Sequence, residues 1–222
     1  MAAAIPHACR RHKADISYHP IVGGGANACT LHYHANDAEL HDGDLMLIDA
    51  GCEYDYYASD ITRTFPVNGR FTAEQRAVYE VVLEAQEAAF AAIKPGNHWN
   101  DPHDAAVRAI THGLVRIGLL KGRVPALIKE EAYKKFFMHR TGHWLGMDVH
   151  DVGDYKVGDE WRVLEPGMCL TVEPGIYIPA GTPGVPRRWW NIGVRIEDDV
   201  AVPAGGFELL TDGLPRTPAE IE

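Results

Sequence analysis

The sequence predicts an α+β fold in a single domain. With 222 residues, 46% of them hydrophobic and 23% charged, the chain has the size and composition of a globular domain that buries a substantial core. Short apolar runs typical of strands occur toward both ends of the chain, and helical periodicity fills the middle. Strands, then helices, then strands is the order expected of an α+β protein, and no repeat or linker divides the chain.

The N-terminal part predicts strands separated by turns. The first 20 residues are polar, basic and interrupted by two prolines, so no regular element is expected there. Three consecutive glycines at 23–25 indicate a tight turn, because glycine tolerates positive φ. A phosphate-binding loop would need a following helix and a Gly-Lys-Ser/Thr ending, and neither is present. Strands are predicted over 28–34 and 45–50, followed by two antiparallel strands placed across Gly51 to Ser59.

The middle of the chain predicts helices. Thr72 and Gln75 fit a capping box at the start of the first helix. Apolar residues recur behind them at helical spacing until Lys94-Pro95-Gly96 ends the pattern. The remaining predicted elements are a helix that begins near Asp101-Pro102 and ends near Gly118, a short helix over 126–135, and strands over 168–173 and 192–202.

Composition excludes several classes of function. The chain has 21 Lys and Arg against 31 Asp and Glu, a net charge of −10, whereas nucleic acid and anionic membrane surfaces require a basic protein face. We therefore expect neither nucleic acid nor a membrane as a partner. No apolar run approaches the length of a membrane span or a signal peptide. Four scattered cysteines without a CxxC pair are typical of reduced thiols, which predicts a cytoplasmic protein.

Four carboxylates stand inside patterns that otherwise predict buried strands. Asp49 ends an apolar run, Asp60 lies in a Tyr/Ile/Thr-rich stretch, and Glu173 and Glu197 each follow a strand pattern. A single buried carboxylate would cost several kcal/mol or take up a proton. Any one of them could simply mark a strand end that reaches water. Four together, with a histidine-rich segment at 136–151, instead indicate a metal site.

The histidine-rich segment contains His139, His143 and His150. A zinc site on His139 and His143 is disfavoured, because two glycines oppose a helix there and no Glu occupies the HExxH position. One imidazole with four carboxylates is an oxygen-dominated donor set that suits Mn²⁺, with Co²⁺, Fe²⁺ or Zn²⁺ as alternatives. Two divalent ions would balance the four negative charges and could activate a bridging hydroxide for hydrolysis.

Five stretches of the sequence together resemble one family. They are LIDAGCEY at 47–54, SDITRTFP at 59–66, HRTGHWLGMDVHDV at 139–152, TVEPGIY at 171–177 and GVRIEDD at 193–199. This set is similar to aminopeptidase P (Xaa-Pro aminopeptidase), one of the dinuclear "pita-bread" metallopeptidases that also include prolidase and methionine aminopeptidase. The resemblance implies a curved, mainly antiparallel sheet with helices on its outer face.

The resemblance also implies a role for each matching residue. Asp49 would hold one metal, Asp60 and Glu197 would bridge both, and His143 and Glu173 would hold the other, with Glu173 also handling a proton beside the hydroxide. His150 would support the developing oxyanion on the substrate carbonyl. The substrate contacts implied are Tyr18, His32, His139, His150 and Arg195, of which His32, His139, His150 and Arg195 join Glu173 as catalytic candidates. No role is assigned to His34, and surface positions are expected for His7, His12, His19, His41, His98, His103 and His112.

The implied activity is hydrolysis of the bond between an N-terminal residue and a proline at the second position. A bond to proline has no N–H on its nitrogen, so recognition must use the free amine and the carbonyl instead. The alternatives are a prolidase, which cleaves only Xaa-Pro dipeptides, and a non-catalytic pita-bread module that binds peptides. The module is disfavoured because such proteins typically lose metal ligands, and all five are present here. We also expect a homo-oligomer.

The sequence departs from the family at its N-terminal side. Family members have a separate N-terminal domain, and their catalytic domain opens with two helices before the strand that begins here near Tyr18. We therefore expect an irregular segment over 1–16 and an incomplete catalytic domain over 17–222, with those first helices missing. Such a domain should leave apolar sheet surface uncovered, and should therefore self-associate, bind a hydrophobic dye or need the rest of its polypeptide.

Overall fold

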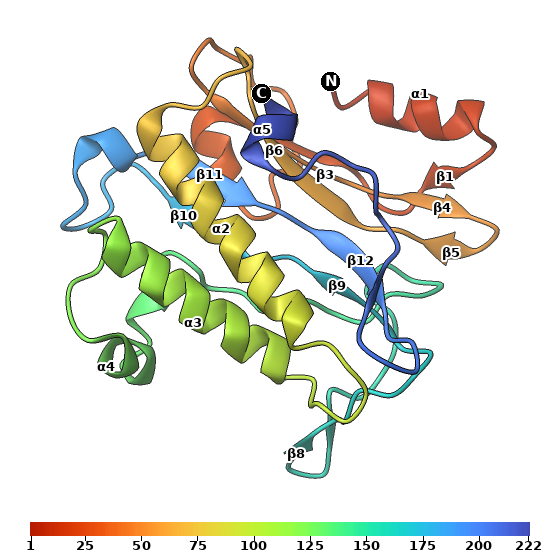
Figure 1. The fold of residues 1–222 in the computed structure, drawn as a ribbon. Coiled ribbons are helices and arrows are strands. Elements are labelled where there is room, and N and C mark those ends of the chain that lie inside the picture. Colours follow the sequence, from red (N-terminus) through yellow and green to blue (C-terminus); the bar gives the residue numbers. More distant parts are fainter.

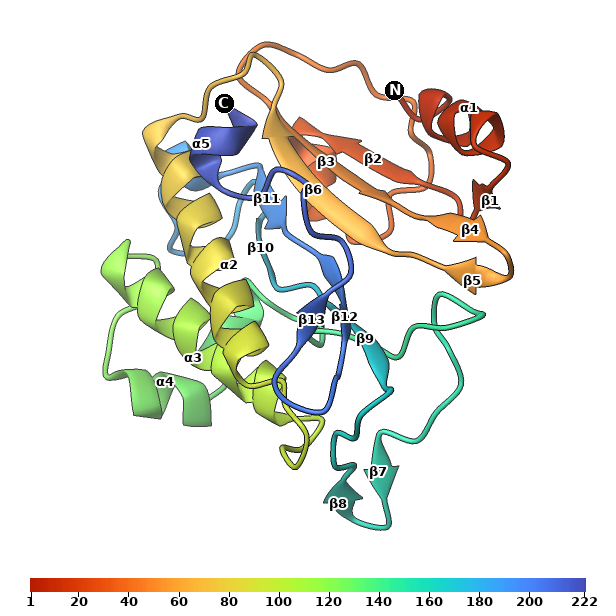
Figure 2. The ribbon, with the colours of Figure 1, turned by 45° about the vertical axis from the view of Figure 1, so that its right-hand side comes forward.

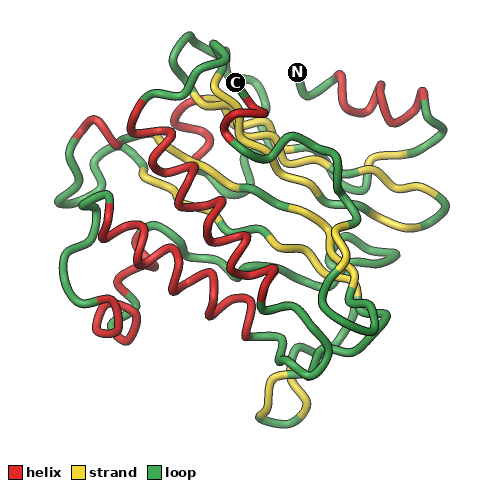
Figure 3. Tube along the Cα trace, in the orientation of Figure 1, coloured by secondary structure: helices red, strands yellow, loops and turns green.

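Two long helices pack side by side against one face of the strands (Figure 1). The structure is a computed structural model that describes residues 1–222. Helices, strands and connecting loops alternate through it as Figure 3 shows. The N-terminal elements are α1 (Ala4–Arg11), β1 (Asp15–Ile16), β2 (Ile21–Gly24), the 3₁₀ helix η1 (Gly25–Cys29), β3 (Leu45–Ala50), β4 (Cys52–Tyr54), β5 (Tyr57–Ala58) and β6 (Ile61–Pro66).

The helical part and the second group of strands follow. The helices are α2 (Ala73–Ala91), α3 (Asp101–Arg116), α4 (Val124–Lys129) and η2 (Ala132–Lys135). The remaining elements are β7 (Lys156–Val157), β8 (Glu160–Trp161), β9 (Cys169–Val172), β10 (Gly175–Ile178), η3 (Arg187–Trp189), β11 (Ile192–Arg195), β12 (Asp198–Ala201), β13 (Glu208–Leu209) and α5 (Pro218–Ile221). No helix combines the length and apolar character needed to cross a membrane.

Every strand pairing in the structure is antiparallel. The order β2-β3-β6 forms one sheet, β13-β12-β9 a second, and β10-β11 a third (Figure 2). The first and second sheets meet where Glu197 N–H donates to the Thr62 carbonyl at 3.0 Å. Farther along β6, the Thr64 hydroxyl donates to the carbonyl of Arg195 at 3.0 Å. The three sheets thus share one continuous layer, and their junction is where the acidic residues lie.

Helices α2 and α3 form the layer that covers this junction. Their contact depends on Gly113, where an added Cβ would lie 2.3 Å from Val81 Cγ1. The buried faces of both helices join the strands in one hydrophobic core of 31 residues, which includes Val82, Ile110 and Val194. The predicted capping box is confirmed, since Thr72 Oγ1 accepts from Gln75 N–H and Gln75 Oε1 accepts from Thr72 N–H.

Three local predictions in the N-terminal part are wrong. Residues 4–11 form α1, within the first 20 residues where no regular element was expected. The segment 28–34 is not a strand; η1 ends at Cys29 and a turn follows. The strand is instead β2, formed partly by the glycines predicted to turn. A Cβ on Gly23 would lie 2.9 Å from the Asn27 carbonyl oxygen, so these glycines permit close packing of η1 on β2.

The later elements agree more closely with the predictions made from the sequence. The two strands across Gly51 to Ser59 are confirmed as β4 and β5, and 168–173 contains β9. The span 192–202 is two strands, β11 and β12, that separate just before Glu197. The helix expected over 126–135 is divided into α4 and η2, because Glu131 takes a left-handed conformation with φ of 53°. The domain boundary at residue 17 stays a prediction.

A buried ion pair holds β6 and β12 together at the junction of the sheets. Arg63 Nη2 lies 2.7 Å from Asp198 Oδ1, and both side chains are almost completely buried. Arg63 Nη1 also donates to the carbonyl of Glu197 at 2.6 Å. Asp198 accepts further hydrogen bonds from Gln86 on α2 and from Thr211. The pair therefore joins β6, β12 and α2 at one point.

We predict that Arg63→Leu lowers the free energy of unfolding by about 3–5 kcal/mol, because it leaves the Asp198 carboxylate buried without its cation. The matched control is Arg116→Leu, which breaks an exposed pair with Glu84 and should cost no more than about 1 kcal/mol. Urea unfolding of both variants measures the difference. The double variant Arg63→Leu/Asp198→Leu should cost less than the sum of its two single changes. Equal losses for Arg63→Leu and Arg116→Leu would contradict the prediction.

Candidate metal centre and active site

The five predicted metal ligands line one cavity of about 460 Å³. They come from separate parts of the chain: β3, the start of β6, the loop after η2, the end of β9, and the break between β11 and β12. The structure therefore brings together Asp49, Asp60, His143, Glu173 and Glu197. Their roles as ligands stay predictions.

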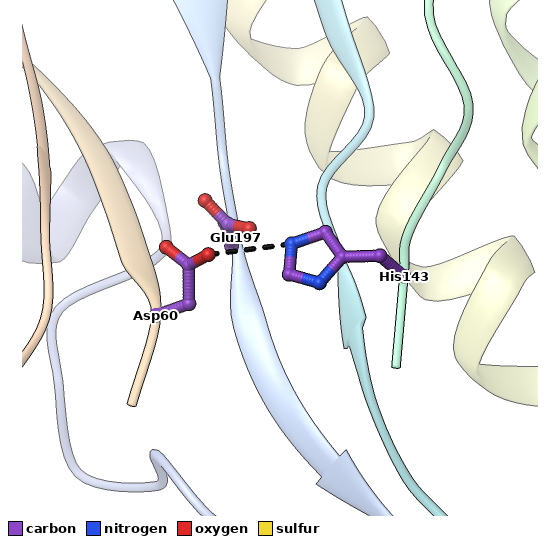
Figure 4. A group of neighbouring side chains, drawn as sticks. All are labelled: Asp60, His143 and Glu197. Carbon is purple, nitrogen blue, oxygen red and sulfur yellow. Dashed lines mark ion pairs between the residues drawn. The ribbon is translucent and has the colours of Figure 1, made fainter. Parts of the chain in front are cut away.

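The tightest group within this set is Asp60, His143 and Glu197 (Figure 4). One donor atom from each lies within 4.8 Å of the others. His143 Nε2 is 3.3 Å from Asp60 Oδ2, while its Nδ1 donates to the Trp144 carbonyl at 2.9 Å. That second hydrogen bond occupies Nδ1 and leaves Nε2 facing the carboxylates, the orientation that a metal ligand needs.

Glu173 lies next to two imidazoles and completes an acidic wall, the four cavity-lining carboxylates Asp49, Asp60, Glu173 and Glu197. Its Oε1 lies 3.8 Å from His143 Nε2, and its Oε2 lies 3.8 Å from His139 Nδ1. Burial, together with the charges of Asp60 and Asp49, raises the pKa of Glu173 to about 7, although Arg195 and His143 act in the opposite direction. Burial likewise raises the pKa of Asp49 and, well above its ordinary value, that of Glu197.

A tyrosine hydroxyl shows how crowded the negative charge is. Tyr18 Oη lies 2.5 Å from Asp49 Oδ1 and 2.5 Å from Asp60 Oδ1. One hydroxyl has a single proton to donate, so it can satisfy only one carboxylate unless the other carries a proton itself. The predicted substrate contact Tyr18 therefore sits directly against two predicted ligands.

The donor set fits a divalent cation. Four carboxylates and one imidazole surround the same space. Burial, together with the neighbouring carboxylates, raises the pKa of Asp49, Glu173 and Glu197, which favours their protonated forms when no cation is bound. Hard oxygen donors with one nitrogen are typical of sites for first-row divalent ions. A cation among them would favour the charged carboxylates without any rearrangement of the fold.

Arg195 is the one cation buried inside this acidic wall. Its Nη2 donates to Asp49 Oδ2 at 2.5 Å and its Nη1 donates to the Tyr177 hydroxyl at 3.1 Å. Tyr177 then donates to His139 Nε2 at 2.9 Å, and His139 Nδ1 donates to the carbonyl of Arg140 at 2.7 Å. Burial and the neighbouring Arg195 lower the pKa of His139 to about 4, so this imidazole is neutral near neutral pH.

The other predicted histidines lie around the mouth of the cavity. His150 meets His143 edge to face, with ring centroids 4.3 Å apart, and burial and His143 lower its pKa. His32 is exposed and lines the cavity; His34 stacks near it at 6.1 Å but does not line the cavity. The structure thus brings His32, His139 and His150 to one cavity, and their roles there stay predictions.

The surface position predicted for His103 is wrong. Its ring is partly buried at the back of the site, 2.8 Å from Thr141 Oγ1 and beside Phe137. Burial, followed by the charges of Arg140 and His139, lowers its pKa to about 3. Helical periodicity alone could have indicated this, because His103 is four residues before Val107 and so shares its buried face.

Sequence reasoning missed two residues that hold the acidic wall. Thr62 Oγ1 donates to Glu197 Oε2 at 2.6 Å, and Tyr177 joins Arg195 to His139. Each lies inside one of the five stretches that resemble the family, SDITRTFP at 59–66 and TVEPGIY at 171–177, where roles were assigned only to other residues. The signal for Thr62 was strand alternation, since it is two residues after Asp60 and therefore points to the same side of the strand.

Comparison with known proteins identifies the family. Residues 1–204 match the model of metallopeptidase family M24. The chain belongs to metallopeptidase family M24. It is 53% identical over 219 residues to an Xaa-Pro aminopeptidase of Haemophilus influenzae, and 52% identical over 219 residues to that of Escherichia coli. Each match covers 98% of this chain, but only 50% and 49% of the relative.

Solved structures of M24 proteins confirm the predicted architecture. Aminopeptidase PepP of Pseudomonas aeruginosa superposes with a TM-score of 0.97 at 63% identity, over 99% of this chain and 50% of that one. A variant of E. coli aminopeptidase P in complex with substrate superposes with a TM-score of 0.95 at 50% identity, over 99% and 50%. The α+β pita-bread fold is therefore confirmed. The chain spans about half the length of the relatives it matches.

Metal binding should stabilise the folded chain. At a hundredfold excess of Mn²⁺ over its Kd, we expect about 2.7 kcal/mol of added stability compared with the protein in chelator, because the ion binds only the native state. His143→Ala should lose this difference, and the matched control His112→Ala, an exposed change on α3, should keep it. Thermal melts of the three proteins make the comparison. An identical midpoint with Mn²⁺ and with chelator in the wild type would rule out the site.

The metal-free protein should lose stability as Glu173 ionises. Its pKa is about 7 in the folded state and about 4.3 in an unfolded chain, so between these values the native state holds a proton that the unfolded state has released. The free energy of unfolding should therefore fall from about pH 4 to pH 7, relative to Glu173→Gln. Urea titrations in chelator test this, with the exposed change Glu87→Gln following the wild type. A constant difference between wild type and Glu173→Gln over this range would contradict it.

Proposed function

We propose that this chain forms the catalytic part of an aminopeptidase that removes an N-terminal residue preceding proline, using two divalent ions, with Mn²⁺ as the first candidate. One observation carries the proposal: the five ligand candidates, three histidines and Arg195 line the same cavity. The relatives and solved neighbours named Xaa-Pro aminopeptidase or aminopeptidase P support the same reaction.

The proposed ligands divide between the two ions as the family resemblance implies. Asp49 would hold one ion, His143 and Glu173 the other, and Asp60 and Glu197 both. When bound, the ions would supply an activated water and polarise the substrate carbonyl. The donor geometry is prepared for this, because Thr62 and Arg195 already fix the orientation of Glu197 and Asp49 through hydrogen bonds of 2.6 and 2.5 Å.

The remaining residues would bind the peptide and move protons. Asp49, Asp60 and Glu197 would hold the ions at one end of the cavity, where the free amine at the start of a peptide would bind to an ion as a neutral nitrogen ligand. His150, at the mouth, would donate an N–H to the carbonyl oxygen of the bond that breaks. Glu173, whose pKa is about 7, would accept a proton and return it to the leaving proline nitrogen.

Two further properties belong to the same proposal. We place the enzyme in a reducing compartment such as the cytoplasm, on the basis of its four unpaired cysteines. We also propose that it assembles as a homo-oligomer. In β3, Leu45, Leu47 and Asp49 are buried while the alternate residues are only half-buried, so the opposite face of this sheet is less well covered within the chain.

Hydrolysis of proline peptides tests the function directly. With Mn²⁺ present, the chain should release alanine from Ala-Pro-Gly, and the double variant Asp60→Asn/Glu197→Gln should release none. Ala-Pro separates the two proline-specific candidates, because a prolidase would prefer this dipeptide whereas an aminopeptidase P would prefer the longer peptide. Failure of the metal-loaded chain to cleave either peptide would overturn the proposal for this chain.

His150→Ala should lower kcat for Ala-Pro-Gly by roughly 10²–10³, because it removes one donor to the developing oxyanion. Its metal content should stay at the wild-type level, since His150 is not among the predicted ligands. The matched control is His34→Ala, an exposed histidine outside the cavity, which should keep wild-type kcat. Steady-state kinetics and metal analysis of both variants give the result. An unchanged kcat for His150→Ala would assign this residue to packing alone.

A further inference from the structure

The cavity has a second end that differs in character from the acidic end. Away from the carboxylates it is lined by three large aromatic side chains and one arginine: Trp99, Tyr155, Trp161 and Arg140. None of these is a predicted ligand or a member of the proposed catalytic set. They belong to the segment before α3, the loop after η2, and the β7–β8 hairpin, which projects from the body at the bottom of Figures 1 and 2.

Arg140 is an exposed residue whose side chain is oriented by two contacts at this end. Its guanidinium lies over the ring of Trp161, 5.0 Å from the ring centroid, and its Nη2 donates to Asn100 Oδ1. The backbone of Arg140 is also tied to the site, because its carbonyl accepts the hydrogen bond from His139 Nδ1. A planar guanidinium stacked on an aromatic ring loses little further freedom when it binds a partner.

A second cation contacts the same ring. Lys156 Nζ lies 4.6 Å from the centroid of Trp161, and the two residues face each other across the β7–β8 pairing. Neither Arg140 nor Lys156 forms an ion pair with any carboxylate of the chain. The charge of Asp104 acts on Arg140 without reaching ion-pair distance. This is notable in a protein with a net charge of −10.

The donors of Arg140 are mostly unused. Only Nη2 has a hydrogen-bond partner within the chain, whereas a guanidinium offers five N–H donors in a fork that matches a carboxylate. One cavity therefore has a predicted metal-binding end, where a free amine would bind, and a basic aromatic end with free donors. A short peptide has the complementary arrangement, with an amine at one end and a negative carboxylate at the other.

We propose that Arg140, supported by Trp161 and Lys156, binds a carboxylate carried by the residue that follows the proline of the substrate. The carboxylate is either the C-terminus of a tripeptide or an acidic side chain at that position. This inference deepens the proposed function by naming the preferred peptide, and it rests on that function for the position of the proline. Arg140 is a specificity-determining residue and takes no part in bond breaking.

Binding of product-like dipeptides tests the inference without requiring catalysis. Pro-Gly carries a terminal carboxylate, Pro-Gly-amide carries none, and Pro-Glu-amide carries one only on its side chain. Calorimetric titration of the Mn²⁺-loaded chain should show Pro-Gly, Pro-Glu-amide or both binding roughly threefold to tenfold more tightly than Pro-Gly-amide. The dipeptide that shows the gain identifies the source of the carboxylate. Raising the salt concentration should shrink the difference.

Variants assign the effect to the proposed residue. Arg140→Gln should bring the affinity for all three dipeptides to that of Pro-Gly-amide, while Lys156→Gln should reduce the preference only in part. The matched control is Arg108→Gln, an exposed arginine on α3 outside the cavity, which should keep the full preference. Arg140→Lys should restore part of the preference lost in Arg140→Gln, because it keeps the charge but not the fork.

The outcomes separate this inference from the proposed function. A carboxylate preference that is lost in Arg140→Gln supports the inference even if the chain hydrolyses no peptide. Hydrolysis of Ala-Pro-Gly with equal affinity for Pro-Gly and Pro-Gly-amide would leave the function standing and overturn the inference. No measurable binding of any dipeptide, or a preference that survives in Arg140→Gln, would overturn it as well.

Discussion

The crowding of carboxylates in one buried space is the constraint on which the rest of this structure depends. Asp49, Asp60, Glu173 and Glu197 share a cavity with one buried cation, Arg195. Burial and mutual repulsion raise the pKa of Asp49, Glu173 and Glu197. A fold can keep such a group together only if other contacts are strong enough to oppose the repulsion, and the arrangement is useful only if a cation relieves it.

The contacts that oppose this repulsion come from residues close to the acidic ones in the chain. Arg63 and Asp198 pair in the core and connect β6 with β12, and Gln86 extends the connection to α2 through its bond to Asp198. Asp199 adds a bond to the backbone N–H of Asp60 at 3.0 Å. These groups have little exposure to water, so their electrostatic attraction is weakly screened. The stability of the fold and the geometry of the site thus depend on the same interactions.

The side chains that line this cavity differ in charge from one part of it to another. Its acidic end is built from strands, where strand pairing sets the position of each side chain closely. Its basic aromatic end comes from the segment before α3, the loop after η2 and a two-stranded hairpin that projects from the body. Residues on a projecting hairpin can change without disturbing the core, so this end of the cavity can vary while the acidic end stays intact.

The sequence by itself determined the family, the α+β class, the capping box of α2 and the five acidic and imidazole groups that the fold brings together. It could do so because strand alternation, cap residues and motif spacing are local signals that a single chain displays. It failed at β2, where glycines permit close packing on η1, and at His103, whose environment comes from Thr141 and Phe137. Only the tertiary structure decided that Thr62 orients Glu197, that Tyr18 lies against two carboxylates, and that Arg140 stacks on Trp161 in the lining of the same cavity. Thr62 and Glu197, for example, are 135 residues apart in the chain, and contacts of that kind are set by how sheets and loops pack, which no local pattern records.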